Sequence, residues 1–587
     1  MEAMVRAGDS PNMTRPDTLT PRAAADPSAA LDAAERALAD GDLAQAQKLV
    51  REALARDPER ARALFLSGKL EHLAGRTESA TQLLERAAKL DPAHVGTRLQ
   101  LAKLYRRARD FDRCLDELSL VLYYAPDNAD AYFEMGVVHR LRGDLDGAID
   151  FLKQALERDP EHARALNELG WLYCGRERFK EALDVLERAI EADPDNIPAQ
   201  NNLGFACVRL EEYDRALAVF QKLCRRTSKS MLWQRVNLGN AYDHTGNLAE
   251  SERAYEHVLR YESNHFTARW NRAHLLLGRR QFESAWPDYD YRLLTEGVGH
   301  PRLVPFAPWK GEPLAGKRLV ISAEQGLGDQ IMFASCIPDL LRQGASVILE
   351  CDHRLAALFQ RSFPEVRVIG SRHELVPTWL REVGHPDYHV PAGSLPGFFR
   401  KRLADFPEHQ GYLRADPEKA ARWRKRLDAL GPGLKVGLSW RGGTRSTRRR
   451  LRSLSLTDLL PVLRAPGCRF VSLQYGDIQA DLDALRQSDG IEIAYWKEAI
   501  ADYDETAALC AALDFTVSVC TSVIHLNGAL GRPAWVMVPA VAEWRYGQQG
   551  ERMPWYPSIR LLRQTAGGDW SDVLATIASG LAARATA

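Results

Sequence analysis

The first half of the chain repeats one pattern of small and helix-breaking positions every 34 residues. A proline cannot continue the hydrogen-bond ladder of a helix, and it also restricts the residue before it. Small residues at fixed distances from each proline would let two helices approach closely. The pattern therefore predicts repeated helix–turn–helix units. Its three columns are Ala46, Ala80, Cys114, Ala148 and Ala182; Pro58, Pro92, Pro126, Pro160 and Pro194; and Gly68, Ala102, Gly136, Gly170 and Gly204.

The small-residue column continues beyond these five units. It reappears at Gly239 and Ala273 after one extra residue in the stretch 224–230. With an earlier helix pair over about 31–57, we expect seven or eight units between residues 27 and 295. The period and its columns resemble the tetratricopeptide repeat, whose units stack into a solenoid.

Polar side chains on the first helix of several units are candidates for binding a partner. An asparagine amide can both donate to and accept from a peptide backbone. We expect Asn167, Asn201 and Asn237 to line a groove that binds a protein or peptide. The alternative is a solenoid that only spaces or dimerises other parts.

The last unit is atypical and rich in aromatic residues, including Trp286, Tyr289 and Tyr291. Terminal repeats need a cap, so we expect this unit to pack between the solenoid and the C-terminal half of the chain. Residues 296–316 hold four prolines and are predicted to be an extended linker.

From Lys317 on, short apolar runs alternate with helical patterns. This alternation indicates parallel sheets covered by helices. Two successive sets predict an α/β fold of two Rossmann-like lobes, 317–415 and 416–587, with ligands at the carboxyl ends of the strands. The expected strands are the runs RLVISAEQ, SVILECD and VRVIG, then KVGLSW, RFVSLQYG, IEIAYW, FTVSVC and AWVMVP.

The motif AEQGLGDQ, residues 323–330, lies at the end of the first expected strand. Gly326 and Gly328 permit a tight turn and close backbone approach, and the next helix offers N–H groups. Neither a Walker loop nor a complete dinucleotide fingerprint is present. Asp329 has two interpretations, a helix N-cap or a general base.

A basic run follows the first strand of the second set. Six arginines fall within residues 441–452, beside Gly442 and Gly443. A solvated basic loop is the ordinary interpretation of such a run. Because arginine binds phosphate oxygens through two parallel hydrogen bonds, we favour an anion site.

Two helix starts in the second set could also contact an anionic ligand. Thr521 and Ser522 stand at a strand-to-helix turn, with His525 one turn further on. Hydroxyls and helix N–H groups form an anion site, although a lone histidine is more often a packed helix residue. Glu505 and Thr506 mark a weaker second start.

Together these motifs resemble the two-lobed (GT-B) glycosyltransferases of the bacterial heptosyltransferase type. The matching residues are Gly328-Asp329 and Thr521 to His525, followed by Ala-Leu-x-x-Pro at 529–533. The whole chain resembles bacterial fusions of tetratricopeptide repeats with a glycosyltransferase, including flagellin glycosyltransferases, and in architecture the O-linked N-acetylglucosamine transferases. One departure is Cys520, where heptosyltransferases usually carry aspartate.

The resemblance implies roles for individual residues. Asp329 would be the catalytic base, the first lobe would face the acceptor and the second lobe the donor. No metal and no cofactor are implied, only a nucleotide-sugar co-substrate. The implied donor-binding residues are Gly326, Gly328, Trp440, Arg441, Arg452, Gln474, Glu505, Thr506, Thr521, Ser522 and His525.

The composition indicates which classes of partner and which cellular compartment to expect. Lys plus Arg and Asp plus Glu both number 78, so overall charge does not argue for nucleic acid or membrane. Nine scattered cysteines without a CxxC pair suit free thiols. The sequence contains no run of about 18 apolar residues, so we expect no membrane-spanning helix. The first 26 residues read as a disordered leader without a secretory signal, so we expect a cytoplasmic protein.

Three functions remain open from the sequence. The leading one is metal-independent transfer of a sugar from a nucleotide-activated donor to a protein, such as flagellin or another surface protein, captured by the repeats. The second keeps the chemistry but takes a lipid-linked or surface glycan as acceptor. The third is a non-catalytic scaffold with a degenerate transferase lobe, which Cys520 favours.

Overall fold

The computed structural model describes residues 27–226, 231–295, 304–372, 378–443, 449–565 and 567–586. They form two compact units that divide between Ala199 and Gln200. The predicted leader at 1–26 and the part of the predicted linker at 296–303 lie outside the described residues.

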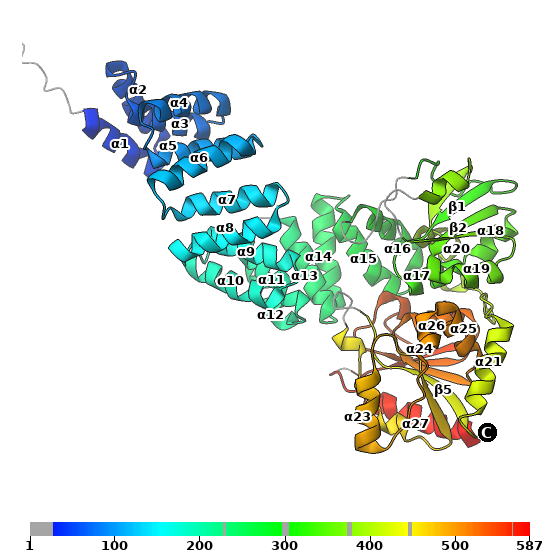
Figure 1. Ribbon diagram of the computed structural model, residues 1–587. Helices are drawn as coiled ribbons and strands as arrows, with labels where there is room; N and C mark the ends of the chain where they lie inside the picture. The colour runs from blue at the N-terminus through cyan, green and yellow to red at the C-terminus, as the bar shows by residue number, and fades with distance from the viewer. Residues whose placement is uncertain are drawn as a thin grey trace, which may run out of the picture. The chain divides into compact units, whose positions relative to one another are not determined.

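Helix pairs fill the described residues up to 289 (Figure 1). The first helices of successive pairs begin 34 residues apart from Ala61 to Ile197, and the next begins 35 residues later, at Leu232. The predicted period and its one-residue insertion are therefore confirmed. The bounds are α1 Pro27–Ala39, α2 Leu43–Arg56, α3 Ala61–Leu73, α4 Thr77–Leu90, α5 Val95–Arg107, α6 Phe111–Tyr124, α7 Ala129–Leu141, α8 Leu145–Arg158, α9 Ala163–Gly175, α10 Phe179–Ala192, α11 Ile197–Arg209, α12 Tyr213–Arg226, α13 Leu232–His244, α14 Leu248–Tyr261, α15 Phe266–Gly278 and α16 Phe282–Tyr289.

The column of small residues allows the close packing within each pair. A Cβ atom on Gly68 would lie 2.6 Å from Leu84 Cγ, and one on Gly239 would lie 2.6 Å from Tyr255 Cε1. Real Cβ atoms do not approach that closely, so a larger residue would push the two helices apart. The column is thus explained by one large side chain of the second helix lying against the backbone of the first.

The first sheet has four parallel strands in the order β3-β2-β1-β4. Three of them are predicted runs, and β4 was not anticipated. The strands are β1 Arg318–Ser322, β2 Ser346–Asp352, β3 Arg367–Ser371 and β4 Tyr388–Pro391, and the helices are α17 Leu327–Ala334, α18 Ile337–Arg342, α19 Ala356–Ser362 and α20 Pro396–Phe399.

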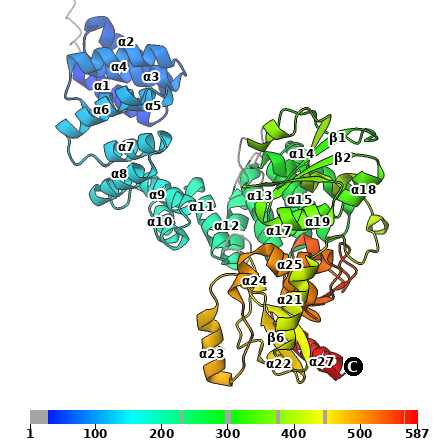
Figure 2. The same ribbon diagram turned by 45° about the vertical axis from the view of Figure 1, so that its right-hand side comes forward.

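The second sheet has five parallel strands in the order β6-β5-β7-β8-β9. Its strands are β5 Leu434–Ser439, β6 Cys468–Ser472, β7 Phe515–Val519, β8 Ala534–Val538 and β9 Ile559–Arg563. Its helices are α21 Pro417–Asp428, α22 Leu460–Leu463, α23 Gln479–Asp489, α24 Lys497–Ala501, α25 Tyr503–Ala512, α26 Ser522–Ala529 and α27 Ser571–Thr586. Figure 2 shows α21 beside α25, a helix pair that also packs together.

The predicted strand IEIAYW is wrong. In that segment only Ala494 pairs with the sheet, through a single bridge to Val471 beside the edge strand β6. Its backbone N–H and C=O bond to Phe470 and Ser472 respectively, and the run then turns into α24. The fold class, helical repeats followed by two parallel α/β lobes, is confirmed.

The last helix pair shares one hydrophobic core with both lobes. Trp270, Trp286 and Tyr289 belong to the same buried cluster as Ile321 of β1 and Trp544 after β8. The indole of Trp286 donates to the Arg400 carbonyl at 2.8 Å. Trp270, Trp286 and Tyr289 are therefore interior side chains of the second compact unit, whereas Tyr291 is partly exposed. None of the described helices is both long and apolar enough to cross a bilayer.

Candidate active site between the two lobes

A cavity of about 550 Å³ opens where the two lobes meet. It is within the size range of small-molecule sites. Residues at α17 and after β2 line it from the first lobe, and residues after β5, β6, β7 and β8 and around α25 line it from the second. The lining residues are Gly326, Leu327, Gly328, Asp329, Arg354, Gly443, Arg452, Leu473, Tyr475, Ile500, Ala501, Tyr503, Thr506, Cys520, Thr521, Ser522, Val523, His525, Glu543, Arg545 and Tyr546.

Two helix N-termini meet at this cavity. α17 follows Gly326 and α26 follows Thr521, and neither first turn is capped by the side chain of its N-cap residue. A Cβ on Gly328 would lie 2.9 Å from His525 Cδ2 and 3.5 Å from Ser522 Cα. Gly328 thus permits the two helix starts to approach, which concentrates backbone N–H groups and positive dipole ends at one place.

Asp329 of α17 forms an ion pair across the lobes with Arg545. Arg545 Nε donates to Asp329 Oδ1 at 2.6 Å, and a terminal guanidinium nitrogen lies 2.5 Å from the same oxygen. Burial raises the pKa of the Asp329 carboxyl above its ordinary value, while Arg545 and a hydrogen bond from the Gly326 N–H oppose that rise. Asp329 lines the cavity as the third residue of α17, whose N-cap is Gly326. The N-cap interpretation of Asp329 is therefore wrong, and its role as general base stays a prediction.

The charged side chains of the cavity alternate in sign. Arg452 lies 2.7 Å from one oxygen of Glu543, and Arg545 lies 3.7 Å from the other. Arg452 sits at the end of a short helix, Arg450–Arg452, and is 8% exposed. A chain Arg452–Glu543–Arg545–Asp329 therefore runs along one wall. In a mostly buried site such pairs are strong, and they are sensitive to any added charge.

His525 reaches the cavity as a neutral imidazole. Its Nδ1 lies 3.1 Å from the Tyr556 hydroxyl, and the residue is 4% exposed. Burial, reinforced by nearby Arg545, lowers the pKa of His525 to about 3. At neutral pH the ring can therefore orient a ligand by hydrogen bonding but adds no positive charge.

Thr521 and Ser522 line the cavity at the start of α26. The Thr521 hydroxyl lies 3.2 Å from that of Ser518. Gly442 lies close beside this turn, because a Cβ there would be 2.9 Å from the Cys520 carbonyl oxygen. The glycine after β5 therefore brings the arginine-bearing loop against the helix start.

Three residues expected to bind the donor form instead the frame of the loop after β5. The Gln474 side-chain oxygen accepts from the backbone N–H groups of Trp440 and Arg441 at 2.9 and 2.8 Å. The Trp440 side chain is buried in the core, and the Arg441 guanidinium lies 2.9 Å from Asp481 of α23. None of the three lines the cavity, although together they hold the loop that does.

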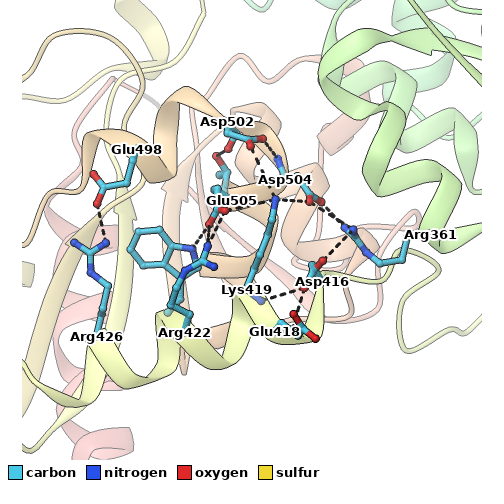
Figure 3. A network of polar contacts seen from close by, with 12 residues as sticks. Arg361, Asp416, Glu418, Lys419, Arg422, Arg426, Glu498, Asp502, Asp504 and Glu505 are labelled. Carbon is cyan, nitrogen blue, oxygen red and sulfur yellow. Dashed lines mark hydrogen bonds and ion pairs between the residues drawn. The ribbon is translucent and has the colours of Figure 1, made fainter.

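Glu505 and Thr506 are adjacent in sequence but face different surroundings. Thr506 lines the cavity. The Glu505 carboxylate accepts from Arg422 at 2.8 Å and from the Trp423 indole at 2.7 Å, both on α21. Figure 3 shows Glu505 in a network of charged side chains between α21 and α25, and it is not a lining residue.

Part of the arginine run lies outside the described residues, at 444–448, which includes Arg445 and Arg448. Within the part of the chain that is described, no group of three or more His, Cys, Asp or Glu side chains could hold a metal ion. In the Asp-x-Asp triplets at 288–290 and 502–504, an aspartate of each pairs with basic side chains. Asp288 pairs with Arg269 and Arg272, and Asp504 pairs with Lys419.

The sequence interpretation missed the loop after β8. Glu543 and Arg545 flank Trp544, whose ring packs against Trp286 and Tyr289 of the last repeat. The guanidinium of Arg545 lies 4.7 Å above the Trp544 ring. The only available signal was the position of these residues after a strand's carboxyl end, where ligands bind in such sheets.

The last repeat also supports the glycine loop before α17. Arg292, fully buried, bonds Glu324 with two nitrogens at 2.7 and 2.5 Å. Gln325, which has a positive φ of 61°, bonds the Tyr289 hydroxyl at 2.9 Å. Since a non-glycine residue in that conformation needs surrounding support, the repeat helps to fix the loop that carries Asp329.

The asparagines expected to bind a peptide lie on the first helices of their units. Asn237 of α13 donates to Asn201 of α11 at 2.9 Å, which places these two side chains together. Asn167 lies on α9, in the other compact unit. All three are partly exposed.

Known proteins match parts of this chain. One tetratricopeptide-repeat family model matches residues 71–134, 140–203 and 175–236, and a second matches 31–95 and 236–301. Protein FlbA of Caulobacter vibrioides is 36% identical over 330 residues, which is 53% of this chain and 54% of FlbA. The chain thus spans about half the length of this curated relative.

Solved structures are similar at low identity. The PilF protein of Pseudomonas aeruginosa is 15% identical with a TM-score of 0.34, covering 37% of this chain and 99% of that one. YrrB, described as a tetratricopeptide-repeat protein with an unusual peptide-binding site, is 20% identical with a TM-score of 0.28, covering 32% and 95%. From the family matches and the helix pairs, the N-terminal region of this chain is built from tetratricopeptide repeats.

Proposed function

We propose that this protein is a glycosyltransferase that moves a sugar from a nucleotide-activated donor to a protein held by its repeats. One observation supports this most strongly. A single cavity brings together Asp329 of the first lobe with Arg452 and the start of α26 of the second lobe. A carboxylate beside a cationic, helix-tipped anion site is the arrangement that sugar transfer from a nucleoside diphosphate requires.

The chemistry assigns one task to each part of the cavity. Asp329 accepts the proton of the acceptor hydroxyl as its oxygen bonds to the anomeric carbon of the sugar. The bond from that carbon to the donor's phosphate oxygen breaks, and the nucleoside diphosphate leaves with the electron pair. Arg452 and the N–H groups of α26 stabilise the negative charge that develops there. His525, being neutral, orients a donor oxygen by a hydrogen bond.

The repeats support a protein as the acceptor. Tetratricopeptide solenoids present extended surfaces that bind proteins. The paired amides of Asn201 and Asn237 offer both donors and acceptors to a peptide backbone. Because the last repeat shares its core with the lobes, deleting residues 27–295 would remove Trp286 and expose lobe residues of the same cluster, such as Ile321 and Trp544. Asparagine substitutions are therefore the better test of this role.

Donor binding is tested by calorimetry of the full chain against a panel of nucleotide sugars. We expect one of them to bind, and we expect Arg452→Met to weaken it at least about tenfold, since a charge-assisted contact is lost. Arg441→Met is the matched control. It removes an arginine of the same loop that contacts Asp481 and does not line the cavity, so affinity should stay within about twofold. If no nucleotide sugar binds, the proposal is wrong.

A non-catalytic scaffold is the second candidate. Cys520 lines the cavity where the resembling enzymes carry a carboxylate, and its thiol is buried and bonded to the Met537 carbonyl. This candidate predicts binding without turnover. Release of free nucleoside diphosphate from a bound nucleotide sugar, measured with wild-type protein and acceptor, separates the two.

A further inference from the structure

Each arginine that lines the described cavity already faces a carboxylate of the protein. Arg545 lies 2.5 Å from Asp329, Arg452 lies 2.7 Å from Glu543, and the third, Arg354, lies 2.9 Å from Asp352. An anion that enters this site must therefore compete with carboxylates for hydrogen-bond donors. The pair Arg545–Asp329 matters most, because it joins a cation to the candidate base.

The Arg545–Asp329 ion pair is mostly buried and engages both side chains. The side chains of Arg545 and Asp329 are 18% and 14% exposed, and they come from opposite lobes. A carboxylate oxygen that accepts two guanidinium N–H groups is a poor proton acceptor. The Arg545–Asp329 pair is thus unsuited to the transfer step.

The setting of Arg545 allows its guanidinium to change partner. The group lies over the Trp544 ring at 4.7 Å, and that ring is fixed against Trp286 and Tyr289 of the last repeat. Stacking holds the plane of the guanidinium while its N–H edge remains available to any anion in that plane. Glu543, 3.7 Å away, offers a second anionic position beside Asp329.

From this geometry we infer that Arg545 is an exchange residue: it pairs with Asp329 in the empty cavity and passes to the donor's diphosphate when the donor binds, which releases Asp329 to accept the acceptor's proton. This inference rests on the proposed function and adds an order of events to it. The donor binds first, and the base becomes competent only once the donor is in place. Proton transfer to Asp329 before the donor binds is thereby avoided.

The exchange is tested with inorganic pyrophosphate as the probe and calorimetry of the full chain. Asp329→Asn keeps the shape of the side chain but removes the competing charge, so pyrophosphate should bind about tenfold more tightly. Glu543→Gln should act in the same direction, and Arg545→Met should weaken binding at least about tenfold. Asp489→Asn is the matched control, because it removes a carboxylate paired with Arg464 outside the cavity and should leave affinity unchanged.

A crystal structure of the full chain with pyrophosphate supplies the second readout. We expect the Arg545 guanidinium to bond a pyrophosphate oxygen and to lie beyond about 4 Å from Asp329, outside ion-pair distance. Binding that depends on Arg452 while the Arg545–Asp329 pair stays intact would overturn the exchange and leave the proposed function standing. Failure of both pyrophosphate and every nucleotide sugar to bind would overturn both.

Discussion

The carboxylate of Asp504 connects three elements of the α/β part, and replacing it should loosen them. Arg361 of α19 in the first lobe bonds Asp504 of α25 in the second lobe, and Lys419 of α21 bonds it at 2.8 Å (Figure 3). The Asp504 side chain is 7% exposed. Asp504→Asn would leave two cations facing a neutral amide at the junction of the lobes.

The size of the effect follows from this burial. Removing one partner of a buried ion pair costs about 3–5 kcal/mol. Arg361 and Lys419 are each about one-quarter exposed, so water recovers part of that loss. We therefore expect about 3 kcal/mol, or roughly a hundredfold increase in local opening of α25.

Hydrogen exchange read by mass spectrometry measures this opening on peptides of α25 and α21. The matched control is Glu498→Gln, which removes a carboxylate paired with Arg426 in the same network (Figure 3). Both of its side chains are well exposed, at 60% and 40%, so exchange should rise less than about threefold. Equal effects of the two substitutions would refute the reasoning.

The effect also has a defined pH dependence. Burial by itself would raise the pKa of Asp504, but hydrogen bonds from Arg361 and Lys419 hold it below its ordinary value of 3.8. A lowered pKa in the folded state adds stability above the ordinary value, and that stability is lost as pH falls through the folded value. The difference between wild type and Asp504→Asn should thus be constant from pH 8 to about 5 and shrink below about 4.

Three further substitutions test the site and its supports. Gly328→Ala would place a methyl group 2.9 Å from His525 Cδ2 and should lower the free energy of unfolding, measured by calorimetry, by about 1–3 kcal/mol. Gly326→Ala is the control and should be nearly neutral, because no neighbour lies closer than 3.8 Å to its Cβ. Similar losses of stability in both would contradict the close packing of α17 on α26. Glu324→Gln would leave buried Arg292 without its main carboxylate and should cost about 3 kcal/mol, seen as faster hydrogen exchange in α16; unchanged exchange would contradict that coupling. The pKa of His525 is lowered to about 3, so below about pH 6.5 unfolding takes up a proton and the free energy of unfolding decreases as the pH is lowered. His525→Gln should make this decrease smaller by about 1.4 kcal/mol per pH unit between pH 6 and 4. An unchanged slope would contradict the neutral buried imidazole.

The repeats could be predicted in detail because their determinants are local. Each proline of the repeat follows the end of a helix. Glycines of the small-residue column leave room for a large side chain sixteen positions later, as Gly170 does for Leu186. These relations recur from one unit to the next, the prolines as far as Pro194, and need no knowledge of the rest of the chain. The strands of the lobes were also largely predictable, since buried parallel strands are short apolar runs.

The candidate site could be predicted only where a residue follows a strand or starts a helix. That rule predicted Asp329, Thr521 and His525 as site residues, and the three line one cavity because the carboxyl ends of both sheets face it. It could not find Arg545, which lies in the short 3-10 helix Trp544–Tyr546 that packs on aromatic residues of the last repeat. It also could not tell that Glu505 turns toward α21.

The failure at IEIAYW has the same origin. Its apolar alternation is that of a strand, but β6 is already the edge of the sheet and only Ala494 pairs with it. Sequence pattern reports which face of a segment is buried, and tertiary contacts decide whether that face meets a sheet or a loop.

The most direct test of the account is transfer itself. Full-length protein is incubated with a radiolabelled nucleotide sugar that binds it and with a cell extract, and label is counted in protease-sensitive material. The account predicts incorporation by wild-type protein, a loss of at least about a hundredfold for Asp329→Asn, which still folds and binds the donor, and reduced incorporation for the Asn201 and Asn237 variants. Full incorporation by Asp329→Asn, or label found only in protease-resistant glycan, would contradict it.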